Sequence, residues 1–353
     1  MAALGVARQV GLVSPAYGVY RPLPGSELLP DFADRLLRIE EYKSEYIARS
    51  TGVNASRLRL YPDQFLRIPV LLPTRKEQEG IARHLEVMDR RVRRFIRNRR
   101  RLIEVLNEQK QAIINRAVTR GLDPNAPLKP SGVEWLGEIP RHWEVRKLKH
   151  LTQFLNGLPF KPSDWKPSGV PIIRIQNLNG SKEFNYTDKG SLPAELLIKT
   201  GDLMFAWSGN RGTSFGSFEW THSFPGYLNQ HIFKLVGFTL PKRYFYYLLR
   251  AVTKHVEEQA GGIIGLVHVT KPELGSVRVP VAPEAEAESI ARHIDAQTAS
   301  INAAIDRAQR EIELIREYRT RLIADVVTGK VDVRHLAPTE PLPKTGPSPL
   351  TPE

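Results

Sequence analysis

The pentapeptide "IARHL" at residues 81–85 returns as "IARHI" at residues 290–294, 209 positions further along the chain. The surrounding sequence is also repeated, as "RIPVLLPTRKEQEGIARHL" at 67–85 and "RVPVAPEAEAESIARHI" at 278–294. From Ile81 onward the offset stays constant, so that Val118 corresponds to Val327. We infer that the chain contains the same unit twice: the end of a strand, a proline-containing turn and a long helix.

Both helices carry a narrow apolar seam, because aliphatic residues recur at alternating steps of three and four. Such a stripe stabilises a helix poorly in water unless another helix covers it. The other copy is the simplest partner, which predicts an antiparallel coiled coil of about 38 residues, or about 57 Å. The alternative is that each helix packs on its own domain. The seam positions are Leu85, Val92, Ile96, Ile103, Leu106 and Ile113 in the first copy and Ile294, Ile301, Ile305, Ile312, Ile315 and Leu322 in the second, with Arg99, Lys110 and Arg319 as interruptions.

The composition is that of a globular chain with room for about two domains. It has 353 residues, of which 41% are hydrophobic, and it has no cysteine. The lack of cysteine excludes a disulfide scaffold, a thiolate zinc site and a cysteine nucleophile, and it fits a cytoplasmic location. The first residues do not resemble a signal peptide. No apolar run is long enough to span a membrane, so we expect no membrane partner.

The formal net charge of +13 points to a polyanionic partner, and nucleic acid is the usual one. The excess is uneven. Residues 83–120 contain twelve Arg and Lys against four acids, whereas residues 292–329 contain six of each. Most of this difference lies in "RRVRRFIRNRRR" at 90–101, where Arg97, Arg100 and Arg101 are predicted phosphate contacts. The alternatives are a solvated helix face and a docking surface for an acidic protein.

The region between the helices, 131–282, reads as an α+β domain that is mostly strand in its middle. Strands are expected at 171–178, 202–207 and 231–238, and a helix at 241–259. Residues 1–72 match only the closing half of this domain. The predicted order is a partial domain at 1–72, the first long helix and turn at 73–123, a linker at 124–130, a complete domain at 131–282, the second long helix at 283–333 and a disordered proline-rich tail at 334–353.

These features resemble the specificity (S) subunits of Type I restriction–modification enzymes. The resemblance rests on "GVEWLGEIPRHWEVRKLK" at 132–149, on "GDLMFAWSGNRG" at 201–212, on the repeated helix starts and on the doubled layout, and it extends to about Val333. The chain departs from the family pattern at its start, where we expect a truncated first target recognition domain. Recognition of two half-sites by one chain is therefore in doubt.

The resemblance implies a non-catalytic, DNA-binding subunit. In the family, each target recognition domain reads one half of a split site in double-stranded DNA, and the paired helices set the spacing between the halves. The helices also dock two methyltransferase (M) subunits, and restriction (R) subunits join through the complex. A rod of the predicted length would reach half-sites about one DNA turn, roughly 34–36 Å, apart.

The sequence lacks the common nucleotide-binding motifs, in agreement with this expectation. No phosphate-binding G-x-x-x-x-G-K-[ST] loop and no G-x-G-x-x-G after a strand are present, so the sequence predicts no nucleotide cofactor. His84 and His293 occupy equivalent helix starts, but each lacks a second ligand one turn away, so we predict no metal site. We expect no catalytic residue and no cofactor in this chain.

Base readout calls for polar side chains on loops of a rigid scaffold. Residues 131–282 contain three polar clusters at the ends of expected strands, and Lys161 and Lys166 nearby are predicted phosphate contacts. For each single residue, an ordinary turn or solvent contact is the alternative. The clusters are Arg174, Gln176 and Asn177; Ser208, Asn210, Arg211 and Thr213; and Asn229, Gln230 and His231.

Two other functions remain open on the sequence. One is a coiled-coil scaffold whose basic helix binds nucleic acid or an acidic protein without reading a sequence. The other is a non-functional remnant of a specificity subunit. Displacement of a bound target by random DNA would separate the scaffold from the sequence reader.

Overall fold

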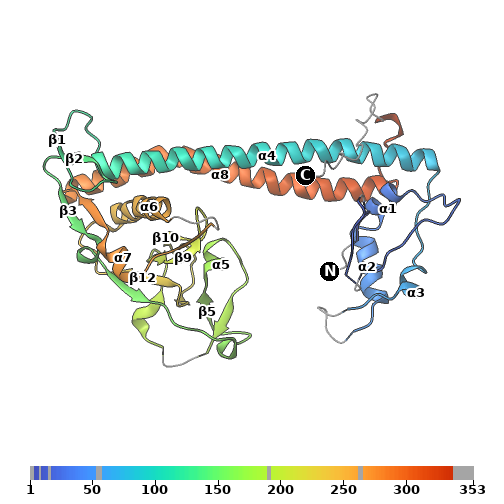
Figure 1. Cartoon of the computed structure of the whole chain (residues 1–353), viewed down its shortest axis with the longest axis horizontal. Coiled ribbons are helices and arrows are strands. Elements are labelled where there is room, and N and C mark those ends of the chain that lie inside the picture. Colours follow the sequence, from blue (N-terminus) through green and yellow to red (C-terminus); the bar gives the residue numbers. More distant parts are fainter. Residues whose placement is uncertain are drawn as a thin grey trace, which may run out of the picture. The chain divides into compact units, whose positions relative to one another are not determined.

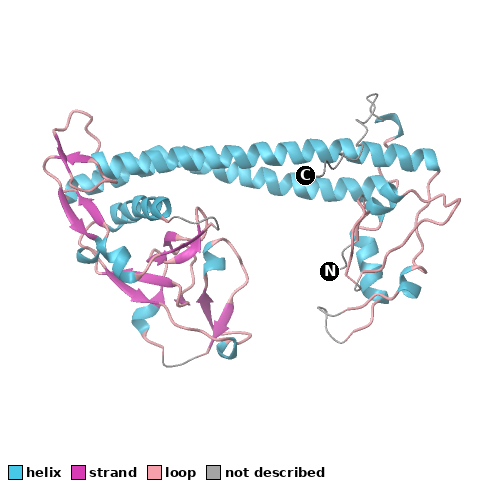
Figure 2. Ribbon diagram, in the orientation of Figure 1, coloured by secondary structure: helices cyan, strands magenta, loops and turns pink. Residues whose placement is uncertain are grey.

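The computed structural model describes residues 4–7, 9–14, 17–52, 58–188, 192–260 and 265–336. The chain divides into two compact units, which we describe separately. Unit 1 is Met1–Ile103 with Ile305–Glu353, and unit 2 is Glu104–Ala304. The predicted α+β class, with two long helices, is confirmed (Figure 2). The proline-rich tail from residue 337 onward lies outside the described residues.

Each long helix contributes to both units. Helix α4 spans Arg75–Arg120 and helix α8 spans Glu284–Val327. A threonine–glutamate capping box begins α4, where the Thr74 backbone N–H donates to Glu77 at 2.9 Å. Neither helix contains a proline between these bounds, so nothing removes a backbone hydrogen bond from either one.

Unit 1 is helical in its described part. A small core joins Phe32, Leu36 and Tyr46 to Leu85 of α4 and Val326 of α8. The helices that precede α4 are α1 (Pro30–Leu36), α2 (Glu40–Arg49) and α3 (Pro62–Phe65), and a short 3-10 helix, η5 (Arg334–Leu336), follows α8.

The strand end expected at 67–70 does not form, although its counterpart in unit 2 does. That counterpart is β14 (Arg278–Val281), which pairs antiparallel with β3 (Glu144–Lys147). Among the described residues of 1–72, the β pairing is a single bridge between Thr51 and Arg59. Here Arg67 and Ile68 instead form a turn and a bend after α3, because no partner strand lies beside them to hold them in a ladder.

Unit 2 is built from short strands with a helix along one side of them (Figure 1). One sheet has the order β10-β8-β12-β4, a second has the order β6-β5-β11-β7, and β9 pairs with β13. The bounds are β1 Leu128–Pro130, β2 Glu138–Pro140, η2 Leu148–His150, β4 Gln153–Asn156, η3 Pro162–Asp164, β5 Val170–Ile173, α5 Ile175–Leu178, β6 Asn185–Thr187, η4 Ala194–Leu196, β7 Leu197–Ile198, β8 Leu203–Ala206, β9 Ser208–Asn210, β10 Gly216–Glu219, β11 Gly226–Leu228, β12 Ile232–Val236, α6 Lys242–Gln259, β13 Leu266–His268 and α7 Lys271–Ser276.

Helix α6 covers the first sheet and joins it to α8. Its buried face includes Tyr244, Phe245 and Leu248, which belong to the same core as Ile290 and Ile294 of α8. Burial of this size is the main stabilising contribution to the unit. Two side-chain contacts fix the junction: Arg243 and Tyr247 of α6 hydrogen-bond to the Asp295 carboxylate, with the tyrosine hydroxyl at 2.5 Å.

Within each unit the two long helices lie side by side and run antiparallel (Figure 1). The first-copy seam is buried at Leu85 and Val92 and half-buried from Ile96 to Ile113. In the second copy the seam positions are buried from Ile294 to Ile312 and half-buried at Ile315 and Leu322. Ile114, beside the predicted position 113, is almost fully buried at 2% exposure because it also faces the core of unit 2.

The three charged interruptions of the seam each have a partner on the opposite helix. In unit 1, Arg99 pairs with Glu311 at 2.6 Å and Arg319 pairs with Asp89 at 2.7 Å. In unit 2, Lys110 donates to Asn302 at 3.0 Å. A one-residue slip of either helix would separate these partners, so they specify the register of the pair.

Candidate nucleic-acid interface

The three polar clusters predicted from the sequence come together in unit 2. The backbone N–H of Asn229 donates to the carbonyl of Ile173 at 2.9 Å, which places the third cluster against the first. The N–H of Trp207 donates to the carbonyl of His231 at 3.1 Å, which places the second against the third. Segments that are 24 and 56 residues apart in the chain therefore lie next to each other at these strand ends.

In the first cluster, Asn177 is buried and holds a turn, whereas its neighbour Gln176 is exposed. The expected strand at 171–178 ends at Ile173, because the side-chain oxygen Oδ1 of Asn177 accepts the N–H of Arg174 at 2.9 Å and caps the start of α5. The Asn177 amide group also donates to the carbonyls of Ser181 and Glu183. Asn177 is only 4% exposed, so its side chain is buried in the turn and is not accessible to a base. Gln176 is exposed and its amide has no hydrogen-bond partner among the described residues.

Arg174 and the two lysines border this first cluster. The Arg174 guanidinium lies over the Trp165 ring at 5.2 Å and donates to the Asn185 side chain at 3.0 Å. Lys166 follows the tryptophan, and its ammonium group is 3.8 Å from the Asp188 carboxylate. Lys161 begins the short turn before it and is exposed. Lys166 is therefore close to Arg174 in the fold, since it adjoins the Trp165 ring that the Arg174 guanidinium covers.

The second cluster is a closed loop between β9 and β10. The Asn210 carbonyl accepts the N–H groups of Thr213 at 3.2 Å and Ser214 at 3.1 Å, and Gly212 takes a positive φ of 72° to make the turn. The loop is tied to α6, because the N–H of Gly212 donates to the buried Glu257 carboxylate at 2.7 Å. The Asn210 side chain is exposed where the loop leaves β9.

Arg211, a predicted base-reading residue of the second cluster, also makes hydrogen bonds that hold the loop. One guanidinium nitrogen, Nη2, donates to the carbonyl of Ala260 at 2.6 Å, and its backbone N–H donates to Gly265 at 2.7 Å. These bonds tie the loop to the chain on either side of residues 261–264. The side chain is exposed, so its other donors stay accessible to solvent.

The third cluster surrounds a tryptophan. The Trp207 indole N–H donates to the carbonyl of Gln230 at 3.0 Å, and its ring lies 5.0 Å from that of His231. The ring of His268 in β13 also contacts this tryptophan, in an edge-to-face arrangement with the centroids 4.9 Å apart. Sequence reasoning missed Trp207 and His268, because neither stands out until β9 pairs with β13. The Gln230 side chain is exposed, and Asn229 is half-buried.

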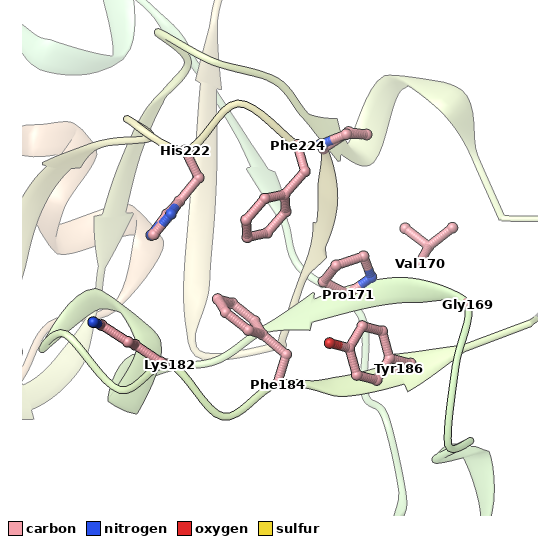
Figure 3. A pocket seen from close by; sticks show the side chains of 9 residues that line it. Gly169, Val170, Pro171, Lys182, Phe184, Tyr186, His222 and Phe224 are labelled. Carbon is pink, nitrogen blue, oxygen red and sulfur yellow. The ribbon is translucent and has the colours of Figure 1, made fainter.

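A pocket of about 760 Å³ opens elsewhere in the sheet that contains β5, β6 and β11. Figure 3 shows Phe184 and Phe224 next to each other, with Tyr186 beside them and Lys182 and His222 at one side. The Phe184 and Phe224 rings are in contact, with centroids 5.4 Å apart, so no planar ligand fits between them. The sequence gave no signal for this pocket, because three separate segments form it.

Helix α6, which holds the loop of the second cluster, is itself anchored electrostatically. Burial alone would raise the pKa of Asp295, but hydrogen bonds from Arg243 and Tyr247 outweigh it and lower the pKa of this carboxyl. Burial, together with the hydrogen bond to Asp295, raises the pKa of Tyr247 above its ordinary value. Asp295 therefore stays ionised and Tyr247 neutral at physiological pH, which keeps the contact between α6 and α8 intact.

Arg97, Arg100 and Arg101 belong to unit 1, on α4, and all three are exposed. In the part of the chain that the structure describes, no group of three or more His, Asp and Glu side chains is placed to hold a metal ion. None of the helices described combines the length and the apolar character that crossing a bilayer requires.

Comparisons with known proteins agree with the resemblance seen in the sequence. A family model described as "Type I restriction modification DNA specificity domain" matches residues 140–314. The MjaVIII specificity subunit of a type I restriction enzyme from Methanocaldococcus jannaschii is 27% identical over 314 residues, which cover 85% of this chain and 70% of that protein. The EcoBI specificity subunit from Escherichia coli is 25% identical over 204 residues, or 56% of this chain and 41% of that protein.

A solved structure gives the same result for the fold. It is described as the structural basis of complex assembly and conformational transition of the type I R-M system. Its TM-score to this chain is 0.54 at 15% identity, covering 86% of this chain and 72% of that one. Residues 140–314 are therefore a Type I restriction modification DNA specificity domain, and the chain is a relative of the specificity subunits of type I restriction enzymes.

Proposed function

We propose that this chain is the DNA-reading, non-catalytic subunit of a type I restriction–modification complex, and that unit 2 reads one half of a bipartite target. The observation that carries the proposal is the convergence of the three polar clusters inside the matched specificity domain. Each cluster contributes one exposed carboxamide, from Gln176, Asn210 and Gln230. We refer to these three residues as the exposed amides.

Side-chain amides suit base readout, because the carboxamide both donates and accepts and so pairs with N6 and N7 of adenine in the major groove. Lys161 and Lys166 would hold phosphates beside the reading surface and so fix the position of the duplex. Arg174, Ser208, Arg211, Thr213, Asn229 and His231 remain further candidates for contact with DNA at the same surface.

The two copies of the long helix support the partner assignment. We propose that they dock methyltransferase subunits, one for each copy, and that restriction subunits join through the complex. The catalytic centres would lie in those partners, and the complex would act on DNA in the cytoplasm. The seam residues Leu85, Val92, Ile96, Ile103, Leu106, Ile113, Ile294, Ile301, Ile305, Ile312, Ile315 and Leu322 would form the helix pair on which this assembly depends.

The proposal that residues 1–72 belong to a first target recognition domain has one supporting observation. In unit 1, Arg35 pairs with Glu86 at 3.3 Å, and in unit 2, Arg243 pairs with Asp295. Glu86 and Asp295 are equivalent positions in the repeat, 209 residues apart. In both copies, then, a preceding helix is held to the long helix at the same place.

The experiment is a selection from randomised duplex DNA with the full chain bound to its methyltransferase subunit. The proposal predicts enrichment of a short defined sequence over successive rounds. Recovery of DNA with no common sequence, at an affinity that depends only on salt, would contradict it and would favour the scaffold that binds nucleic acid without reading it.

A further inference from the structure

Four arginines of α4 lie along one face of the helix. Arg90, Arg94, Arg97 and Arg101 follow steps of four, three and four residues, which place them on the same side. All four are exposed, whereas the seam positions Leu85 and Val92 are buried, so the face points away from α8. We call these four residues the arginine stripe.

The second copy of the repeat has no such stripe. The positions equivalent to the stripe on α8 are Ala299, Ala303, Asp306 and Arg310, all of them exposed. The two helices share their seam but not their outer faces. The helix pair therefore does not require these arginines. They indicate a binding partner that contacts α4 but not α8.

The stripe weakens the helix that carries it. Like charges one turn apart destabilise a helix by about 0.2–0.5 kcal/mol per pair. Within the described residues no carboxylate forms an ion pair with Arg90, Arg94 or Arg97. Arg93, beside the stripe, does pair with Glu86, at 3.6 Å. An anionic partner from outside the chain would offset this repulsion.

We propose that the arginine stripe binds the phosphate backbone of duplex DNA without reading its sequence. At about 1.5 Å per residue the stripe is about 16 Å long, and duplex DNA presents about one charge per 1.7 Å of its axis. Guanidinium groups suit phosphate oxygens because they donate two parallel hydrogen bonds. A protein partner that docks on both copies would need a face that the copies share, which the stripe is not.

This inference rests on the proposed function only in that the ligand is DNA. Its test uses DNA of random sequence, so no target sequence has to be known. The triple variant R90Q/R94Q/R97Q removes three charges while keeping good helix formers. The full chain and the variant are titrated with a random-sequence 40-base-pair duplex between 50 and 300 mM KCl. Each lost phosphate contact lowers the slope of log affinity against log salt by about 0.9, so the slope falls by about two to three units.

The control is R307Q/R310Q/R316Q on α8, which has the same change in net charge on exposed arginines. We expect its slope to fall by less than one unit, and we expect both variants to keep the wild-type melting temperature.

Equal slopes for the two variants would overturn the proposal. So would unchanged DNA binding together with loss of the methyltransferase subunit in co-purification, since that result assigns the stripe to an acidic protein. If the wild-type chain shows no sequence preference but the two variants show the expected salt slopes, the proposed function is wrong and this inference still holds.

Discussion

At the scale of single residues, Gln176 and Asn177 show how one sequence motif divides into structural and candidate reading roles. Both are amides at the end of a strand, and sequence reasoning treated them alike. The structure separates them because α5 begins there and turns Asn177 inward, where it makes three hydrogen bonds, while Gln176 faces solvent. Composition predicts the amide cluster, but only the turn decides which amide remains available.

This contrast gives a matched pair of variants. Asn177→Ala leaves backbone groups of a buried turn unpaired and should lower the free energy of unfolding by about 1–3 kcal/mol. Gln176→Ala should change the free energy of unfolding by less than about 0.5 kcal/mol, as a surface substitution does. It should instead lower discrimination between the selected and a random sequence by about 1–3 kcal/mol. Urea unfolding and DNA titrations measure the two effects, and the assignment is wrong if Gln176→Ala keeps full discrimination.

Glu257 is a positioning residue for the loop that presents Asn210. Its buried carboxylate accepts the N–H of Gly212, so Glu257→Ala should free the loop and lower discrimination at least tenfold. Glu257→Gln keeps an accepting oxygen and should restore most of it. Thr253→Val, one turn earlier on α6, removes a bond at 3.2 Å to the N–H of Ser217 in strand β10 and serves as the control. It should lower stability without changing which sequence is selected; equal discrimination in all three variants would argue against the role of Glu257.

At the scale of elements, the helix pair was the most predictable part of the molecule. Heptad spacing in two copies predicts both helices and their antiparallel pairing, since a narrow apolar stripe needs a partner stripe. The charged interruptions looked like defects in the sequence. In the structure they are matched pairs across the helices, and this was unpredictable because the partner of each depends on the register.

A charge exchange tests that register in unit 1. Arg99→Glu and Glu311→Arg should each destabilise the chain, because each places like charges in contact. The double variant restores the pair and should recover about 0.5–1 kcal/mol relative to the sum of the single effects, as expected for a partly exposed ion pair. Thermal unfolding of the four proteins measures the coupling. Additive effects would show that these two side chains do not meet.

Asp89 of α4 joins three helices of unit 1, because its carboxylate accepts hydrogen bonds from Arg35 of α1 and Arg319 of α8. Its side chain is buried, at 2% exposure. Burial would raise its pKa, but the hydrogen bond from Arg319 and the charges of Arg35 and Arg319 outweigh burial and lower it. Because the pKa of Asp89 is lower in the folded state, its ionised carboxylate stabilises the folded chain. This contribution to the free energy of unfolding is complete above about pH 4, the pKa of Asp in the unfolded chain, and it is lost as the pH falls through the lower pKa of the folded state.

Asp89→Asn should therefore lower the free energy of unfolding by about 2–3 kcal/mol at pH 7. Below pH 4 the difference between the two proteins should shrink, because the wild-type carboxyl becomes protonated as well. Urea unfolding between pH 3 and pH 7 measures it. A difference that stays constant across this range would contradict the assignment of an ionised Asp89.

At the scale of the whole molecule, the sequence predicted the α+β class and the family, because both depend on repeats and local phrases. It also predicted three polar clusters, but not that they would adjoin. Their convergence follows from pairings between distant strands, such as β5 with β11 and β9 with β13, whose register no local pattern specifies. The same limit explains why the expected strand at 67–70 does not form. Its sequence matches that of β14, but among the described residues of 1–72 no strand lies beside it to pair with.

The most direct measurement of the central claim is the ratio of dissociation constants for random and selected DNA, in the wild-type chain and in Gln176→Ala/Asn210→Ala/Gln230→Ala. If the exposed amides read bases, the ratio falls at least a hundredfold while affinity for random DNA stays within about twofold. An unchanged ratio, or an equal loss of affinity for both DNAs, would contradict the claim that this surface reads the sequence.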